Sequence, residues 1–407
     1  MKILPSETKP KLLFCSSRVP FPIIAGYSIR VINLLRILAT HFDVTLVALG
    51  AGSENDACEI KRQTGVKEIV FLMHSAGLGV FGALRAFFAG DPLQIGYYKS
   101  PKMRNYLIRE GNKFNVLIFH LVRTAWACPP NLLGRSIIEM CDLLSENYAQ
   151  TYRKSSWLSP WKVVSWIEKK RLRRFEIFCA DNFAGTTLHT MRDMGDIGPR
   201  LGSRALISTQ GVDIEKYRFT PPSARHGFDI IFVGKIDFFP NRDGVEWFAC
   251  EVLPLLPKAY SLKVIGDCSK KLKAKLMKIE RVQVTGRVES IEAEVINGIV
   301  AIAPMRVATG VQNKVLEYFA LGLPVISSED VSAGLLNWPT PTHIIAKSAT
   351  EWANEILKLA SDEIKMNNLA LNARNYVEKM HNWVEIGDQY LKFVSLISPL
   401  SVPIDNS

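Results

Sequence analysis

P-M-R-V-A-T-G-V-Q-N-K-V-L-E-Y-F-A-L-G-L-P-V-I-S, residues 304–327, has the most informative residue pattern in the chain. It follows an apolar run at 299–303, which predicts a strand. Gly310 then precedes a predicted helix, Gly322 closes that helix, and a second strand begins at Val325. A strand, a glycine loop, a helix and a strand make a βαβ unit, and such a unit offers anions a helix N-terminus.

The predicted helix has two different faces. Apolar residues at helical spacing predict that one face packs on a sheet, and these are Val311, Val315, Leu316 and Phe319. The other face carries Gly310, Asn313, Lys314 and Glu317. Glu317 lies about 10 Å along the helix axis from Gly310, so a diphosphate at the helix start and a ribose held by Glu317 fit this span. The alternative for Glu317 is a simple Lys314–Glu317 helix pair, worth only a few tenths of a kcal/mol.

The first half of the chain alternates strands and helices. Apolar runs predict strands at 11–15, 44–48, 68–72, 115–119 and 136–140. Gly26 ends a turn-rich loop after the first strand, Tyr27 begins a predicted helix at 27–40, and His120 ends the fourth strand. Gly26 and His120 lie at the carboxyl ends of strands, where open sheets bind ligands. Gly26 stands alone, so the dinucleotide fingerprint G-x-G-x-x-G is missing. A purely structural role for Gly26 and His120 is the alternative.

The second half repeats this alternation. Strands are predicted at 229–233, 262–265, 282–285 and 299–303, and helices at 245–256 and 348–396. Gly234 and Lys235 directly follow the first of these strands. Residues 220–227 are rich in Pro and Ser and predict a linker, and residues 208–213 form a turn in which Gly211 is available for a positive φ. Two serial doubly wound α/β domains predict a ligand cleft between them.

Composition narrows the possible partners. A chain of 407 residues predicts two domains, and a formal charge of +11 suits nucleotide phosphates, nucleic acid or an acidic membrane, although a merely basic soluble protein is the alternative. The 7 cysteines are scattered without a C-x-x-C pair, which predicts reduced thiols and no metal site. The sequence shows no signal peptide and no apolar run long enough to span a membrane, so we expect a cytoplasmic protein.

One segment combines aromatic and basic residues. W-L-S-P-W-K-V-V-S-W-I-E-K-K-R-L-R-R at 157–174 suits the lipid headgroup region and anionic lipid. A basic surface helix whose tryptophans cap the core is the alternative. No helix-turn-helix, zinc-finger or RNP signature accompanies the segment, so nucleic acid is not predicted as a partner. The predicted membrane residues are Trp157, Trp161, Trp166, Lys169, Lys170, Arg171, Arg173 and Arg174.

Five segments in this order resemble the GT-B glycosyltransferases of family 4. The resemblance is closest to the bacterial sugar transferases of exopolysaccharide clusters associated with exosortase systems. The segments are P-F-P-I-I-A-G-Y-S-I-R-V-I-N-L-L-R at 20–36, Q-G-V-D at 210–213, F-V-G-K-I-D-F-F-P-N at 232–241, V-T-G-R-V at 284–288, and G-V-Q-N-K-V-L-E-Y-F-A-L-G-L-P-V-I-S at 310–327. It implies a GT-B fold, in which two Rossmann-like doubly wound domains face a cleft.

The resemblance also implies a chemistry. It implies a retaining transfer from a nucleotide-diphosphate sugar, without a metal or another cofactor. Glu317 matches the family's acidic residue that holds the ribose, and Lys235, beside Gly234, matches the basic residue that neutralises the leaving diphosphate. The backbone N–H groups expected to contact the diphosphate are those of Gly310, Val311 and Gln312.

The chain departs from the family at two positions. The family's other acidic residue is here Thr309, which is still expected in the donor site because it can donate and accept hydrogen bonds. The family's second basic residue is here Asn241, and the missing charge is expected from Arg242 or Arg306.

These observations lead to one hypothesis and one alternative. We expect a glycosyltransferase that is peripheral on the cytoplasmic face of the inner membrane and transfers a sugar to a lipid-linked saccharide or another oligosaccharide in surface polysaccharide synthesis. Its predicted parts are an acceptor domain at 1–207, a donor domain at 208–378 and a C-terminal helix at 379–407 that crosses back. A catalytically inactive partner of a polysaccharide assembly complex is the alternative. A nicotinamide dehydrogenase or an epimerase is disfavoured, because neither G-x-G-x-x-G nor Y-x-x-x-K occurs.

Overall fold

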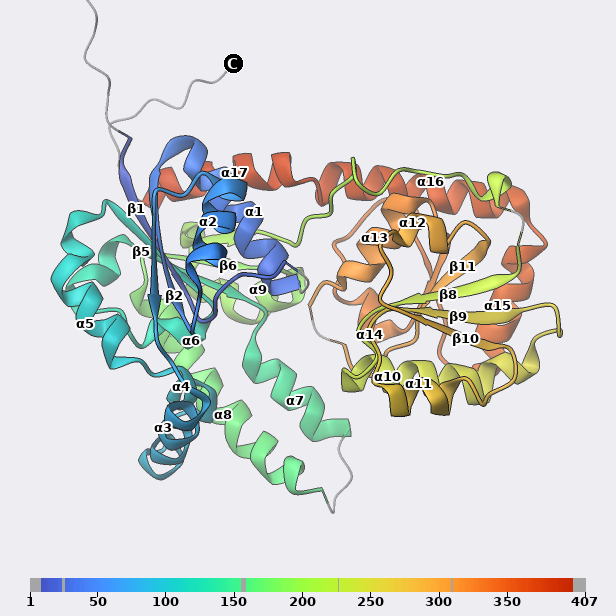
Figure 1. Cartoon of the computed structure of the whole chain (residues 1–407), viewed down its shortest axis with the longest axis horizontal. Coiled ribbons are helices and arrows are strands. Elements are labelled where there is room, and N and C mark those ends of the chain that lie inside the picture. Colours follow the sequence, from blue (N-terminus) through green and yellow to red (C-terminus); the bar gives the residue numbers. More distant parts are fainter. Residues whose placement is uncertain (1–8, 24–25, 155–158, 226, 309, 398–407) are drawn as a thin grey trace, which may run out of the picture. The chain divides into compact units, whose positions relative to one another are not determined.

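The structure, a computed structural model, describes residues 9–23, 26–154, 159–225, 227–308 and 310–397. The chain forms two compact units (Figure 1). Unit 1 contains residues 1–208 and 386–407, and unit 2 contains residues 209–385.

Unit 1 is built on a seven-stranded parallel sheet with the order β3-β2-β1-β4-β5-β6-β7. Its strands are β1 (Lys11–Ser16), β2 (Asp43–Leu49), β3 (Glu68–Leu72), β4 (Val116–His120), β5 (Ser136–Cys141), β6 (Gly185–Leu188) and β7 (Ala205–Ile207). Its helices are α1 (Gly26–His41), α2 (Glu54–Thr64), α3 (Ala76–Ala89), α4 (Leu93–Tyr98), α5 (Pro101–Glu110), η1 (Gly111–Lys113), α6 (Val122–Ala125), η2 (Pro130–Arg135), α7 (Leu144–Lys154), α8 (Pro160–Asn182), α9 (Met191–Ile197), η3 (Gly198–Arg200) and η4 (Gly202–Arg204).

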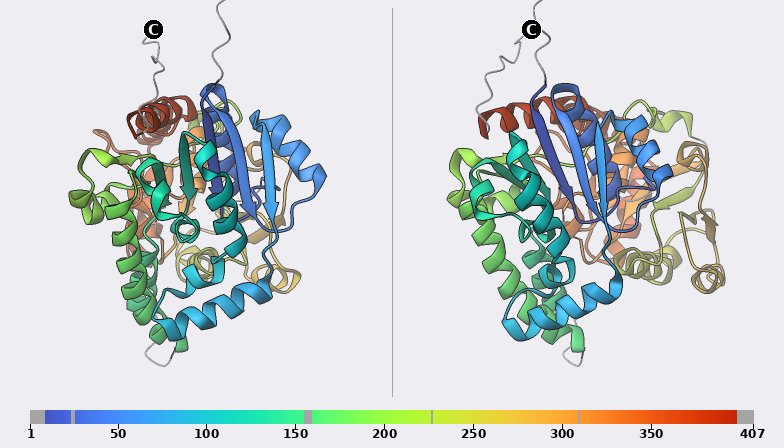
Figure 2. Two further views of the ribbon diagram at one scale, coloured as in Figure 1. Left: turned by 90° about the vertical axis from the view of Figure 1, so that its left-hand side faces the viewer. Right: turned by 60° about the vertical axis from the view of Figure 1, so that its left-hand side comes forward.

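Both faces of this sheet are covered by helices (Figure 2). Leu12 and Phe14 of β1 point to a core shared with α1, and Leu13 and Cys15 point to a second core shared with α5 and α8. This alternation follows from the two-residue period of a strand, and burial on both faces explains the continuous apolar runs in the sequence. The end of helix α17 (Trp383–Ile397) packs on the α1 side through side chains such as Tyr390.

Unit 2 has a six-stranded parallel sheet with the order β10-β9-β8-β11-β12-β13. Its strands are β8 (Asp229–Val233), β9 (Ser261–Ile265), β10 (Val282–Gly286), β11 (Gly298–Ala303), β12 (Val325–Ser327) and β13 (Ile344–Ile345). Its helices are η5 (Pro222–Ala224), α10 (Phe239–Trp247), η6 (Phe248–Val252), η7 (Leu253–Leu255), α11 (Lys270–Leu276), α12 (Ile291–Glu294), α13 (Asn313–Leu321), α14 (Glu329–Ser332), α15 (Ala349–Ala360) and α16 (Glu363–Met380).

The strand orders identify one ligand crevice in each unit. In a doubly wound sheet, ligands bind outside the carboxyl ends of the strands where the strand order reverses. That point lies between β1 and β4 in unit 1, and between β8 and β11 in unit 2. The predicted α/β, doubly wound architecture is confirmed, and β3 and β8 have the predicted bounds.

Three local predictions are wrong. Residues 220–227 do not link two domains, because the Arg225 guanidinium donates to the carbonyls of Val295 and Leu321 and ties this segment into unit 2. Gly211 is not among the residues with positive φ; glycine is needed there because an added Cβ would lie 2.5 Å from the Trp383 ring. The single helix expected at 245–256 is instead divided among α10, a π-helical turn and a 3-10 turn.

Among the helices of the described residues, none is both long and apolar enough to span a membrane.

Candidate functional site

The βαβ unit of β11, α13 and β12 lies at the crevice of unit 2. Strand β11 ends at Ala303, helix α13 begins at Asn313, and Gly310 between them has φ +65°, a conformation that favours glycine. Gly310 is buried, whereas Val311 and Gln312 are partly exposed. Thr309 lies outside the described residues.

A second loop joins the crevice after β8. Gly234 follows this strand with φ +156°, and Lys235 after it is exposed. The Asn241 side chain closes this loop, because its Nδ2 donates to the Lys235 carbonyl at 2.8 Å. The structure therefore places Gly234 and Lys235 at the strand end where they were expected.

Lys314, predicted on the polar face of helix α13 without a role of its own, is buried beside this loop. Its Nζ donates to Asn241 Oδ1 at 2.6 Å and lies 4.1 Å from the centre of the Phe232 ring. Burial lowers the pKa of Lys314 to about 7, although the charge of Glu317 acts in the opposite direction. A basic residue on the predicted helix was a visible signal, but its partner is 73 residues away in the sequence.

Glu317 is partly exposed on the same helix. Burial raises its pKa to about 7, and a hydrogen bond from Tyr217 and the charges of Lys216 and Lys314 oppose that shift. The ammonium of Lys314 donates to Asn241 rather than to Glu317, so the i,i+3 ion pair considered as an alternative does not form among the described residues. Glu317 is therefore a half-buried carboxylate on the first two turns of α13.

Neither arginine proposed for the missing charge enters the buried part of this crevice. The guanidinium of Arg306 donates to both carboxylate oxygens of Asp243, at 2.9 and 2.5 Å, and is half exposed. Arg242 is exposed, with its guanidinium 5.9 Å from the centre of the Phe239 ring.

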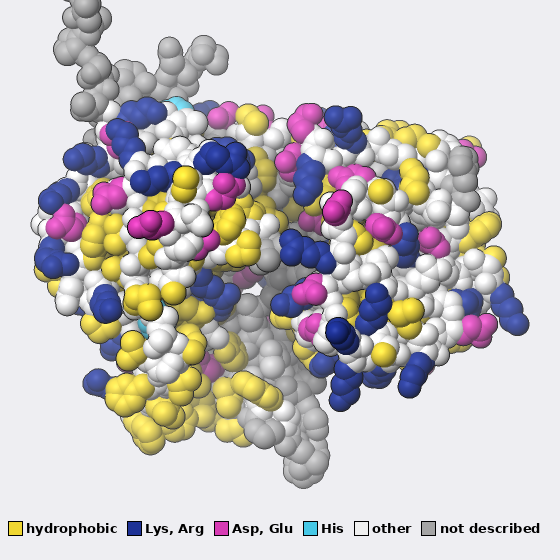
Figure 3. Space-filling model, viewed as in Figure 1, with side chains coloured by type: hydrophobic (Ala, Val, Ile, Leu, Met, Phe, Trp, Pro, Cys, Tyr) yellow, Lys and Arg dark blue, Asp and Glu magenta, His cyan; other side chains and the backbone are white. Residues whose placement is uncertain are grey.

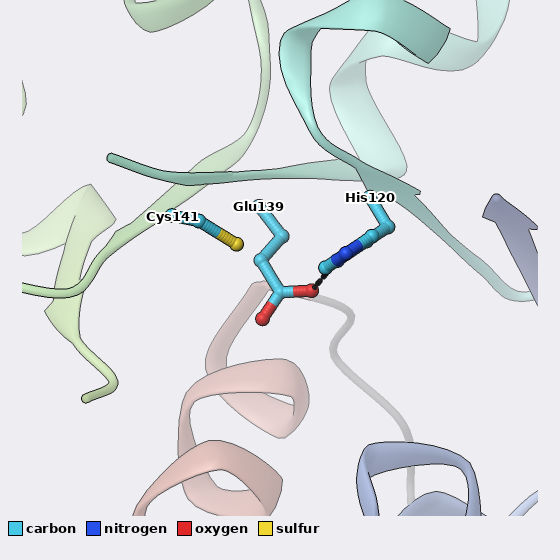
Figure 4. Close-up of side chains that lie close together, drawn as sticks. All are labelled: His120, Glu139 and Cys141. Atoms are coloured by element: carbon cyan, nitrogen blue, oxygen red, sulfur yellow. Dashed lines mark hydrogen bonds and ion pairs between the residues drawn. The ribbon is translucent and has the colours of Figure 1, made fainter. Parts of the chain in front are cut away.

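The crevice of unit 1 holds a buried ion-pair network that the sequence analysis missed, apart from His120. His120 and Glu139 are register partners on β4 and β5, so their side chains meet on one face of the sheet (Figure 4). The Glu139 carboxylate accepts from His120 Nδ1 at 2.5 Å and from Arg30 Nε of α1 at 2.7 Å. All three residues are buried.

Electrostatics fix the protonation of this network. Burial alone would raise the pKa of Glu139, but the charges of Arg30 and His120 outweigh it and lower that pKa to about 2. Because an ionised carboxylate only accepts hydrogen bonds, the proton of this contact belongs to His120 Nδ1. His120 Nε2 then remains available toward the crevice, next to the Tyr27 ring, whose centre lies 5.2 Å from that of His120.

The loop residues expected in unit 1 also lie in this crevice. Gly26 is the first residue of α1, and the Tyr27 hydroxyl is hydrogen-bonded to the Ser16 hydroxyl and to the Arg18 carbonyl. Burial raises the pKa of Tyr27 to about 12. The structure thus brings Tyr27 and His120 together.

Backbone strain marks the same strand ends. Leu121 directly follows β4 with φ +66°, and Cys141 ends β5 with φ +63°. Such conformations cost about 1–3 kcal/mol for residues with a side chain, and they cluster at functional sites. Two buried polar atoms at strand ends of this sheet have no hydrogen-bond partner among the described residues, namely Ser17 Oγ and His189 Nε2. Strain and unpaired polar atoms together indicate a ligand site.

His120, Glu139 and Cys141 also satisfy the distance test for metal ligands, since one ligand atom of each lies within 4.8 Å of the others. Their chemistry does not fit a metal. Both carboxylate oxygens of Glu139 are already bonded, one of them to the cation Arg30. Burial raises the pKa of the Cys141 thiol well above its usual value, so the sulfur is not a thiolate. The cluster is best described as an ion-pair network.

The predicted membrane segment lies on α8, except Trp157, which is outside the described residues. Trp161 and Trp166 are 66% and 46% exposed, so they do not cap the core. Several of the basic side chains have partners on unit 1: Lys169 lies over Tyr152, Lys170 over Trp166, Arg171 donates to the Asp91 carbonyl, and Arg173 pairs with Asp196.

A larger apolar surface on α3 was missed. The helix packs closely on α4 through glycine residues. A Cβ on Gly82 would lie 2.3 Å from the Gly96 carbonyl oxygen, so a larger residue would not fit there. The other apolar side chains of α3 are exposed and gather on one surface of unit 1 (Figure 3). This α3 surface consists of Leu78, Val80, Phe81, Leu84, Phe87 and Phe88. Arg85 is the one charged residue of helix α3. The near absence of charge over residues 76–89 was the sequence signal for this surface.

Comparisons with known proteins bear on the fold and on the second unit. Residues 227–362 match the family model "Glycosyl transferases group 1". A search of curated proteins found no match. Among solved structures, the chain is similar to HepE from Anabaena in complex with UDP-glucose, with 12% identity, a TM-score of 0.66, and coverage of 95% of this chain and 99% of HepE.

Two further structures have the same fold. The sucrose-phosphate synthase from Thermosynechococcus elongatus is 14% identical, with a TM-score of 0.67 and coverage of 96% of this chain and 99% of that one. The lipopolysaccharide outer core galactosyltransferase WaaB is 13% identical, with a TM-score of 0.59 and coverage of 96% and 100%. The chain therefore has the GT-B fold of two Rossmann-like units, and the larger part of its second unit matches the glycosyl transferases group 1 model.

Proposed function

We propose that this protein is a glycosyltransferase that transfers a sugar from a nucleotide-diphosphate donor to a saccharide acceptor. The observation that carries the proposal is the crevice between β8 and β11, where Gly234, Lys235 and Glu317 lie in the unit that matches the family model. The solved structure of HepE holds UDP-glucose, which makes a uridine nucleotide the first donor to test.

The proposed donor site assigns one role to each group. Glu317 accepts hydrogen bonds from the ribose hydroxyls, and the backbone at Gly310, Val311 and Gln312 donates to the diphosphate at the start of α13, where the helix dipole also favours an anion. Lys235 neutralises the charge that builds on the diphosphate as the glycosidic bond breaks. Retention of configuration and independence from metal are part of this proposal.

The crevice of unit 1 is proposed to bind the transferred sugar or the acceptor. His120 Nε2 is oriented by the Nδ1 bond to Glu139, so it can contact a sugar hydroxyl without losing its position. Ser17 Oγ and His189 Nε2, which have no hydrogen-bond partner among the described residues, suit the hydroxyl groups of a saccharide. A lipid-linked saccharide of a surface polysaccharide is the proposed acceptor, in keeping with the similarity to the galactosyltransferase WaaB.

The first test is a thermal-shift screen of the full chain against UDP, GDP, ADP, CMP and TDP, their sugars, NAD and NADP. A ligand at 100 times its dissociation constant stabilises by about 2.7 kcal/mol, so one nucleoside diphosphate and its sugar are expected to raise the melting temperature. Glu317→Ala is expected to weaken that ligand by about tenfold, the cost of about 1.5–3 kcal/mol for a hydrogen bond to a charged group.

The outcomes separate the proposal from its alternatives. Binding with donor hydrolysis or transfer supports the enzyme, whereas binding without either points to a catalytically inactive partner. A response to NAD alone, or to none of these ligands, contradicts the donor site. If Glu317→Ala folds and binds as the wild type does, the ribose role of Glu317 is wrong.

We also propose that unit 1 contacts an anionic bilayer, through α3 as well as α8. Exposed apolar patches as large as the α3 surface mark interaction sites, and Phe88 alone is 83% exposed. Arg171 of α8 lies 5.5 Å from the centre of the Phe87 ring, so positive charge borders this surface. Apolar side chains next to basic ones suit the headgroup boundary of anionic lipid.

Phe81→Glu/Phe88→Glu is therefore expected to lower binding to phosphatidylglycerol vesicles several-fold in a flotation assay. Ile364→Glu is the matched control, because Ile364 is 76% exposed but lies in unit 2. Equal losses in both variants, or a wild type that stays with the soluble fraction, would contradict a lipid role for α3.

A further inference from the structure

Lys314 is the most unusual charged residue of the donor unit. The residue is only 9% exposed, although lysine is rarely buried without an ionic partner. Its ammonium has three N–H groups, and among the described residues its only hydrogen bonds go to Asn241 Oδ1 at 2.6 Å and, weakly, to the Met305 sulfur at 3.8 Å. A buried ammonium without a carboxylate partner lowers stability, so this arrangement calls for a functional reason.

The position of the ammonium points to that reason. Phe232, over which it lies, belongs to β8, and Gly234 directly follows this strand. A Cβ on Gly234 would lie 3.0 Å from Lys314 Nζ, so a side chain at this position would crowd the ammonium. Lys314 Nζ therefore lies beside the loop that begins with Lys235, at the reversal point of the strand order.

The structure explains one of the two departures from the family pattern, the one at Asn241. The family's second basic residue corresponds to Asn241, which carries no charge but holds the ammonium of Lys314. We infer that Lys314 supplies the second positive charge for the diphosphate of the donor, and that Asn241 is the residue that positions it. This inference rests on the proposed glycosyltransferase function.

Other cations are less suited to this task. Arg306 is bound by both oxygens of Asp243, and Arg242 is exposed to solvent. Water around an exposed guanidinium screens its charge, whereas a buried ammonium acts across a medium of lower effective dielectric constant. A charge held in the crevice therefore contributes more to diphosphate binding than a charge on its rim.

The burial of Lys314 couples donor binding to protonation of its amine. Burial lowers its pKa to about 7, so near pH 7.5 part of the free protein carries a neutral amine. The charged group that acts on it is Glu317 on the same helix, while the contacting residues Phe232, Met305 and Asn241 are uncharged. A bound diphosphate favours the ammonium and raises this pKa, so donor binding takes up protons and weakens as the pH rises above 7.

The test is titration calorimetry of the full chain with UDP, GDP and ADP, and with the corresponding nucleosides, in phosphate and Tris buffers at pH 7.5. Lys314→Met has an unbranched side chain that is one atom shorter than that of lysine, and it removes the charge. It is expected to weaken the preferred diphosphate by tenfold or more, to leave the nucleoside nearly unchanged, and to abolish the proton uptake. Its melting temperature without ligand is expected to stay equal or to rise, because a buried charge is replaced by an apolar group.

A second variant distinguishes a lost charge from a damaged loop. Asn241→Lys in the Lys314→Met background places a cation at the position that the family uses, and we expect it to restore most of the diphosphate affinity. If the wild type binds a diphosphate and Lys314→Met binds it equally, the role of Lys314 is overturned and the donor site stands. If the wild type binds none of the diphosphates, both this role and the proposed function are overturned.

Discussion

Glu139→Ala is expected to destabilise unit 1 by about 3–5 kcal/mol, the usual cost of removing one partner from a buried ion pair. The variant leaves the guanidinium of Arg30 buried without its carboxylate and removes the acceptor of the His120 Nδ1 proton. A typical domain is stable by only about 5–15 kcal/mol, so this loss is a large share of the total. Hydrogen exchange is the suitable measurement, because amides of β4 and β5 report on unit 1 and amides of β8 serve as an internal reference in unit 2.

A double variant identifies the cause of this loss. Arg30→Met/Glu139→Met removes both charges and fills the space with apolar atoms, so most of the stability should return. If the double variant is as unstable as Glu139→Ala, the loss comes from packing and the electrostatic explanation is wrong. Glu139→Gln is expected to lie between the wild type and Glu139→Ala, because the amide still accepts from Arg30 but carries no charge.

The same network predicts how stability depends on pH. The pKa of Glu139 is lowered to about 2 in the folded state, below its unfolded value of about 4.3. Its contribution is therefore complete above about pH 4.3 and is lost as the pH falls through about 2. Acid unfolding of unit 1 is expected to be steep in this range in the wild type and shallower in Arg30→Met/Glu139→Met.

Parallel strands were the most predictable part of the fold. Strands in the interior of a sheet are buried on both faces, so they appear as uninterrupted apolar runs, as in Val116–His120 and Asp229–Val233. Gly234, directly after the second of these strands, marks the crevice. The sequence also contains a signal for Glu139. A charged residue inside the buried strand Ser136–Cys141 requires a partner, and Arg30 in the apolar helix α1 requires one as well.

The contacts that distinguish this site depend on tertiary structure. Lys314 and Asn241 belong to different helical segments, and only the packing of α13 against β8 brings them together. The α3 surface has a similar origin, because a run of small and apolar residues at 76–89 is equally compatible with a buried helix. Its exposure follows from the close packing of α3 on α4 at Gly82 and Gly96. A single sequence does not show which helix pairs with which.

Lys235→Met is expected to lower turnover by about 10²–10³, the usual effect of removing one group that stabilises charge in a transition state. The Lys235 side chain is exposed, but its backbone is held, since its carbonyl accepts from Asn241 Nδ2 at 2.8 Å and from the Phe238 N–H at 3.3 Å. Because the backbone of Lys235 is fixed and its side chain is free to move, the ammonium can approach the diphosphate as negative charge develops on the phosphate oxygens. Lys235 should therefore act mainly on the transition state, whereas the buried Lys314 acts already on the bound diphosphate.

The two roles predict different kinetic signatures. In Lys235→Met, kcat for donor hydrolysis or transfer should fall far more than the affinity for UDP measured by calorimetry; in Lys314→Met, the affinity should fall first. Lys258→Met is the control, because Lys258 is an exposed lysine of the same unit outside the crevice. Equal losses of kcat and affinity in Lys235→Met would mean that Lys235 binds the ground state and the transition state alike. Unchanged kinetics would contradict the catalytic role of Lys235. Lys314 would then be the remaining cation proposed for the diphosphate.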